Sequence, residues 1–157
     1  TTFRKMAEDT MEHAVEVGML ESRSCITESL HLHGWMDRED PKLPQDHVRR
    51  YYGSDAAAVD AIDAERPELA EQLHPNITYR GAEVVWAVRN EMALTVEDVL
   101  ARRTRSLLLD ARASMEVAPL VASIMAAELG KDENWQKEQV EHYRELASGY
   151  TLEESRA

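Results

Sequence analysis

The stretch from residue 79 to residue 110, YRGAEVVWAVRNEMALTVEDVLARRTRSLLLD, constrains the fold more than any other part of the chain. Its first half carries apolar side chains at the spacing of one helical face. These are Val84, Val85, Val88 and Met92. Thr95 and Asp98 then have the spacing of a capping box at the start of a further helix. The pattern predicts a helical core built around this stretch.

Arginines crowd this apolar pattern, and two interpretations of them remain open. The cluster consists of Arg89, Arg102, Arg103 and Arg105. In the structural interpretation each arginine has a carboxylate partner, because an unpaired charge beside a core is costly; Arg102, for example, can reach Asp98 on the same helix face. In the other interpretation the guanidinium groups bind an anion such as phosphate. The many acidic residues of the chain favour the structural interpretation.

Apolar periodicity elsewhere predicts further helices, separated by short breaks. Phe3, Met6, Ala14 and Val17 share one face of an initial helix, and Val117, Val121 and Ile124 share a face of a later one. Residues 19–43 break this periodicity and predict a long early loop. The fold class is therefore all-α, a single compact domain of about six or seven helices.

Composition narrows the class of function. The chain has 157 residues and a formal net charge of −12, which excludes nucleic acid as a partner because phosphates require a basic surface. No apolar run approaches the roughly 20 residues of a transmembrane helix. The single cysteine, Cys25, excludes an internal disulfide, indicates a reducing, cytoplasmic setting, and is expected to be buried.

Motifs for catalysis or cofactor binding are missing from the sequence. It contains neither GxGxxG nor GxxxxGK[ST], and no serine lies in a nucleophile elbow. His31 and His33, with Glu28 nearby, could begin a metal site, but further ligands are missing and a loop is favoured. We therefore predict no catalytic, cofactor-binding or metal-binding residue in the chain.

Three segments together resemble the FAD-dependent glycerol-3-phosphate dehydrogenases, and more narrowly their C-terminal helical domain. The segments are TTFRKMAED at the start, ITYRGAEVVWAVRNEMALTVEDVLARRTRSLLLD in the middle, and EVAPLVASIMAAELG later. The matching positions of the family pattern are Tyr79, Glu83, Val84, Trp86, Ala87, Arg89, Glu91 and the run 102–105. Phe3 and Trp86 stand where the family commonly has tyrosine.

The resemblance implies that residues 1–157 are the C-terminal cap of a larger flavoprotein whose FAD-binding body is absent here. The parent enzyme would oxidise glycerol 3-phosphate to dihydroxyacetone phosphate, reduce FAD and pass electrons to quinone. The resemblance also implies a peripheral location for the parent enzyme on the inner face of the membrane. The chain starts without methionine, which also indicates a segment of a longer protein. Thr1, Thr2 and Arg4 would lie near the junction with the flavin domain.

The partner implied by the resemblance is the chain's own FAD-binding domain, and a homo-oligomer is possible. The isolated domain is expected to be inactive and to hold no cofactor. An alternative from a different class is an independent acidic helical adaptor that binds a partner protein through an exposed helix face.

Overall fold

The structure is a computed structural model that describes residues 2–151. Within that range it contains seven α-helices, which confirms the predicted all-α class. They are α1 (Thr2–Val17), α2 (His47–Tyr52), α3 (Ala56–Glu65), α4 (Gly81–Asn90), α5 (Ser106–Leu109), α6 (Ala111–Leu129) and α7 (Glu133–Ser148). Shorter turns of helix are η1 (Gly53–Asp55), η2 (Pro67–Leu69) and the π-helical η3 (Asp98–Arg103).

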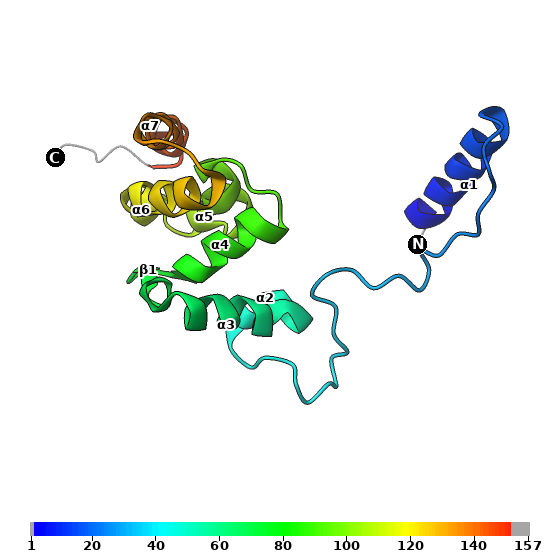
Figure 1. Cartoon of the computed structure of the whole chain (residues 1–157), viewed down its shortest axis with the longest axis horizontal. Helices are drawn as coiled ribbons and strands as arrows, with labels where there is room; N and C mark the ends of the chain where they lie inside the picture. Colours follow the sequence, from blue (N-terminus) through cyan, green and yellow to red (C-terminus); the bar gives the residue numbers. More distant parts are fainter. Residues whose placement is uncertain (1, 152–157) are drawn as a thin grey trace.

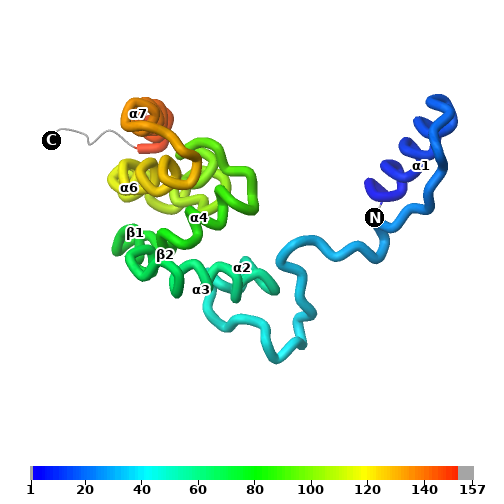
Figure 2. The backbone as a smooth tube through the Cα atoms, viewed as in Figure 1, coloured from blue at the N-terminus to red at the C-terminus, as the bar shows by residue number. Residues whose placement is uncertain are grey.

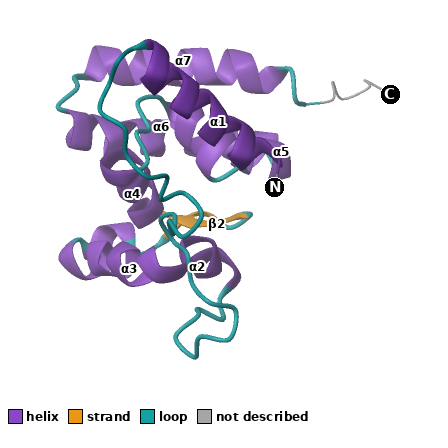
Figure 3. Cartoon of the chain, turned by 90° about the vertical axis from the view of Figure 1, so that its right-hand side faces the viewer, coloured by secondary structure: helices purple, strands orange, loops and turns teal. Residues whose placement is uncertain are grey.

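A small β-hairpin, which the sequence analysis did not predict, joins η2 to α4. Strand β1 (Gln72–His74) pairs antiparallel with β2 (Ile77–Arg80). Figure 3 shows the hairpin between α3 and α4. Leu73 and Ile77 are buried. Leu73 therefore anchors a strand of this hairpin in the core.

Helix α4 occupies the middle of the folded part and is buried along most of its length. Figure 1 shows α3 on one side of it, and α6 followed by α7 on the other. Its core residues Val84 and Val85 are fully buried, as the periodicity predicted. Close packing begins at its first residue, because a Cβ on Gly81 would lie 2.7 Å from the Leu69 side chain.

Met92, which was expected on the same apolar face as Val84, is instead 83% exposed. Helix α4 ends at Asn90, and Met92 takes a left-handed backbone conformation with φ 55°. The amide of Ala93 then donates to the carbonyl of Ala87 at 3.0 Å, which satisfies a carbonyl oxygen in the last turn of the helix. The helix stops before the periodic pattern does, so the Met92 side chain turns to solvent.

Helices α6 and α7 pack against each other and complete the core. Asp110 caps α6 by accepting a hydrogen bond from the amide of Ala113, and Gly130 ends it in a left-handed conformation. On α7, Tyr143 is buried, and its hydroxyl donates to the Ser114 hydroxyl at 2.9 Å. This side chain fastens the last helix to the rest of the core.

Residues 2–46 do not join this core. Helix α1 has no buried residue, and Figures 1 and 2 show it projecting away from the other helices on a long connector. We call residues 2–46 the N-terminal arm. The helix is present as predicted, but its apolar face has no counterpart in the described part of the chain. Cys25 lies in the connector and is exposed, so the expected burial is wrong.

Two glycines bring the arm's connector against the folded part. A Cβ on Gly53 would overlap the carbonyl oxygen of Gly34, and a Cβ on Gly34 would lie 2.9 Å from the carbonyl oxygen of Tyr52. Both glycines also have positive φ, 75° for Gly34 and 50° for Gly53, a region in which side chains are strained. Backbone-to-backbone contact at this point therefore depends on glycine at both positions.

Candidate functional site

The arginines that the sequence analysis grouped together lie at separate places with separate partners. Arg89 donates to Glu128, at 2.7 Å through Nε. Arg102 donates to Asp98 at 2.7 Å and to Glu97 at 2.6 Å. These contacts leave Arg89 and Arg102 neutralised by carboxylates and partly exposed.

The last two members of the cluster differ from each other. Arg103 is half-buried and donates to the backbone carbonyl of Glu91 at the end of α4. Arg105 is exposed, and in the described part of the chain its side chain takes part in no hydrogen bond or ion pair with another residue. Its backbone has φ 55°, in the left-handed region.

A cluster of one arginine and two carboxylates, which the sequence analysis missed, is more deeply buried. Arg80, at the end of β2, donates to Glu83 at 2.7 Å through Nη2 and at 3.2 Å through Nε. The backbone amide of Arg80 also donates to Glu83, at 2.7 Å. The other terminal nitrogen of Arg80 contacts Asp63 on α3. This one guanidinium therefore joins α3, the hairpin and the first turn of α4.

In this buried cluster, burial and ion pairing act in opposite directions on the pKa values of Asp63 and Arg80. Glu83 is only 1% exposed, and one carboxylate oxygen of Asp63, Oδ1, is buried without a hydrogen-bond partner. Burial raises the pKa of Asp63, although the nearby charge of Arg80 opposes that rise. Burial alone would lower the pKa of Arg80, but the bond from Glu83 and the charges of Glu83 and Asp63 raise it overall. The group is a structural ion network that depends on Arg80.

A sequence signal for this cluster did exist. Glu83 follows Arg80 by three residues at a helix start, which is the spacing of a capping box. Asp63, however, lies 17 residues away, and that contact depends on how α3 packs on the hairpin. Sequence spacing could suggest the local pair but not its burial.

An aromatic contact closes the side of α4 that faces α2. The ring of Trp86 is half-buried and meets the ring of Tyr52 edge-on, with centroids 6.4 Å apart. Burial raises the pKa of Glu91, against the charge of Arg103 and a hydrogen bond with Trp86. These contacts account for the Trp86 ring by packing within the protein.

The helix start at Asp98 behaves as the sequence predicts. The Asp98 carboxylate accepts hydrogen bonds at 3.0 Å from the amides of Leu94 and Thr95, while the Thr95 hydroxyl accepts one from the Asp98 amide. Burial alone would raise the pKa of Asp98, but these bonds and Arg102 lower it overall. The element that follows is π-helical, a rare form found frequently at functional sites.

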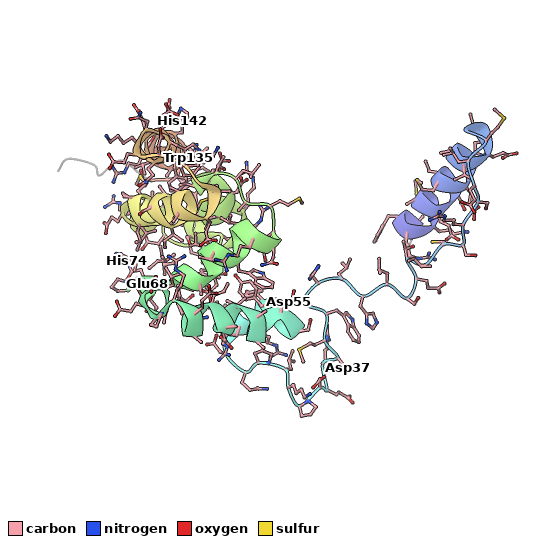
Figure 4. All side chains as sticks on the ribbon, viewed as in Figure 1. Asp37, Asp55, Glu68, His74, Trp135 and His142 are labelled. Carbon is pink, nitrogen blue, oxygen red and sulfur yellow. The ribbon has the colours of Figure 1, made fainter. Side chains whose placement is uncertain are left out.

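The histidines of the early loop take unrelated partners. The ring of His31 stacks on Trp35, with centroids 3.6 Å apart, whereas Nδ1 of His33 lies 3.3 Å from the carboxylate of Asp55. Figure 4 shows Asp55 in the folded part, where the connector approaches it. Among residues 2–151, no group of three or more histidine, cysteine or carboxylate side chains is arranged to hold a metal ion.

The N-terminal arm carries apolar side chains that the rest of the described chain leaves uncovered. On α1, Phe3 is 75% exposed and Met6 is 63% exposed, and Figure 4 shows the side chains of this helix standing apart from the folded part. Arg4, on another side of the helix, bonds Glu8 at 3.2 Å and approaches Thr27 of the connector at 3.5 Å. The connector thus packs on the Arg4 side and leaves the apolar side open. Exposed apolar side chains that share a helix face are typical of surfaces that contact another protein.

Residues expected near a junction with a flavin domain lie at the start of this arm. Thr2 is the first residue of α1 and Arg4 lies in its first turn, whereas Thr1 is outside the described residues. No helix in the described range is both long and apolar enough to cross a membrane.

Comparison with known proteins identifies the family. Residues 25–139 match the family model described as the C-terminal domain of alpha-glycerophosphate oxidase. A probable mitochondrial glycerol-3-phosphate dehydrogenase of Caenorhabditis elegans is 37% identical over 92% of this chain and 22% of its own length. The mitochondrial glycerol-3-phosphate dehydrogenase of Homo sapiens is 32% identical over 93% of this chain and 22% of its own length. No solved structure is significantly similar.

These relatives correct one expectation and weaken another. The expected cytoplasmic location is wrong, since the relatives from Caenorhabditis elegans, Bos taurus and Homo sapiens are named as mitochondrial. The alternative of an independent helical adaptor finds no support among them. The chain spans about a fifth of the length of the curated relatives that it matches. With more than two thirds of its residues inside the matched segment, this chain belongs to the family of C-terminal domains of glycerol-3-phosphate oxidases and dehydrogenases.

Proposed function

We propose that residues 1–157 form the C-terminal helical domain of an FAD-dependent glycerol-3-phosphate dehydrogenase and brace its FAD-binding body. In this proposal the parent enzyme oxidises glycerol 3-phosphate to dihydroxyacetone phosphate and passes the electrons through FAD to quinone. This domain supplies no catalytic group. The family match and the small share of the relatives' length that it covers support the assignment.

The uncovered side of α1 is the observation that carries the docking role. Phe3 and Met6 are mostly exposed although they share a helical face with Val17, which is also exposed. A helix with such a face is stabilised chiefly by packing that face against something else. We propose that the FAD-binding body covers it, with Thr1, Thr2 and Arg4 near the junction.

The ion pairs support the second half of the proposal, that the domain is structural. Arg89 and Arg102 are held by carboxylates of this chain, and Arg80 is held inside the fold by Glu83 and Asp63. Guanidinium groups with such partners are not poised to bind a substrate phosphate. The proposal therefore assigns these arginines to the fold and not to catalysis.

Variants of the arm test the docking role. We expect Phe3→Ser combined with Met6→Gln to weaken association with the separately expressed FAD-binding part of the parent enzyme by about a hundredfold, since each lost apolar contact contributes more than 1 kcal/mol. The measurement is isothermal titration calorimetry. Because neither side chain is buried in this chain, its melting temperature should stay unchanged.

Glu12→Gln provides the matched control. Glu12 is exposed on the acidic side of α1. Like Met6→Gln, this substitution introduces a glutamine, so it alters the helix without removing apolar surface. Its affinity should equal that of the wild type. Equal affinity for the wild type and the double variant would refute docking through the arm, and failure of the wild type to bind would refute the proposed function itself.

A further inference from the structure

Arg105 combines a strained backbone with an exposed side chain. Its φ of 55° and ψ of 20° lie in the left-handed region. This conformation costs free energy for residues that have a Cβ, whereas glycine adopts it without that cost. Strained residues of this kind persist where the surroundings impose them, and they concentrate at functional positions.

The neighbours of Arg105 show what imposes this conformation. Thr104 is buried, its amide donates to the carbonyl of Val99 at 2.9 Å, and its hydroxyl donates to the same carbonyl at 3.0 Å. The hydroxyls of Thr104 and Ser106 are 2.8 Å apart, and Ser106 is also buried. The residues on both sides of Arg105 are thus fixed in the core, and the chain turns outward between them.

Two exposed leucines share the turn with Arg105. Its carbonyl accepts hydrogen bonds from the amides of Leu108 at 3.0 Å and Leu109 at 3.2 Å. Leu108 is 66% exposed and Leu109 is 75% exposed. We call Arg105, Leu108 and Leu109 the α5 patch. The charge of Arg105 also reaches Tyr79, because it opposes the rise that burial causes in the pKa of Tyr79.

We propose that the α5 patch is a second contact surface for the FAD-binding body, on which Arg105 pairs with a carboxylate and the two leucines enter an apolar groove. The inference rests on the proposed function. The choice of occupant follows from the length of the relatives, of which this domain covers about a fifth. Arginine beside apolar side chains is a composition that contributes strongly to interfaces.

The pairing of the neighbouring arginines supports this choice. Arg102 and Arg103 have partners within the chain, whereas Arg105, in the part of the chain that the structure describes, has no ion pair. The chain carries a formal net charge of −12. An exposed cation left unpaired in so acidic a protein is suited to a carboxylate from outside it.

Arg105→Gly separates this role from a structural one, because stability and binding should change in opposite directions. Relief of the left-handed backbone should raise the melting temperature of the isolated chain by about 2 to 4 °C. Loss of the guanidinium should weaken binding to the FAD-binding part about tenfold by calorimetry. Leu108→Ser should weaken binding to a similar extent.

Met92→Gly is the matched control, because Met92 also has φ 55° and is mostly exposed. It should raise the melting temperature similarly while leaving the affinity within about twofold. Binding by Arg105→Gly equal to that of the wild type, or a lowered melting temperature, would overturn this inference. A third outcome separates the two proposals: the wild type binds, the Phe3→Ser, Met6→Gln variant binds weakly, and Arg105→Gly binds like the wild type. In that case the α5 patch is not a contact surface, while the proposed function still holds.

Discussion

Replacing Arg80 by methionine is expected to lower the free energy of unfolding by about 4 kcal/mol, as measured by urea denaturation of the chain. Arg80 is the partner of the buried Glu83 and of Asp63, which already has one oxygen without a hydrogen bond. Without the guanidinium, two carboxylates remain in a region poor in water. Such uncompensated buried charge is among the most destabilising changes a fold can undergo.

Two further variants make this expectation specific to the buried network. Adding Glu83→Gln to Arg80→Met removes the more deeply buried charge and keeps an acceptor for the Arg80 amide, so most of the loss should be recovered. Arg102→Met is the same substitution at an exposed pair, and it should cost less than about 1 kcal/mol. Similar losses of unfolding free energy at Arg80 and Arg102 would show that the buried network contributes no more to stability than an exposed ion pair.

Tyr143→Ala should be the second large loss, again about 4 kcal/mol, the range for truncation of a large buried aromatic. Of the residues of α7, only Tyr143 and Ala147 are buried. Truncating Tyr143 opens a cavity against α6 and removes the hydrogen bond to Ser114. Hydrogen exchange should therefore accelerate first in α7, while α4 stays protected.

Tyr143→Phe isolates the contribution of the hydroxyl. This variant keeps the ring and loses only the bond to Ser114, whose own hydroxyl still donates to the carbonyl of Ala111 at 2.8 Å. The expected cost is about 1 kcal/mol. If the phenylalanine variant were as unstable as the alanine variant, polar bonding rather than packing would hold α7 in place.

The helical core could be predicted from the sequence because its helices are long and regularly patterned. Val84, Val85, Val117 and Val121 are all buried as their spacing predicts. The hairpin was missed because its strands have three and four residues, which is too short for an alternating pattern to show. Met92 was misplaced because the end of α4 depends on backbone geometry, which overrides hydrophobic spacing.

Features that depend on partners distant in sequence could not be predicted. The spacing of Arg80 and Glu83 indicates a local pair, but the third member, Asp63, arrives through the packing of α3. The apolar face of α1 predicted a helix correctly, yet no residue in the described part of the chain covers it. Cys25 excluded an internal disulfide without specifying a compartment, so the cytoplasmic prediction had little physical support.

The most direct test of the account is whether the purified chain binds flavin and turns over substrate. The chain is mixed with excess FAD, separated by gel filtration, and assayed for dye reduction with glycerol 3-phosphate. We predict a colourless protein with no dye reduction, because the proposed function assigns the redox chemistry to the FAD-binding body and only a bracing role to this domain. A yellow protein that retains stoichiometric flavin, or one that reduces the dye, would contradict the account.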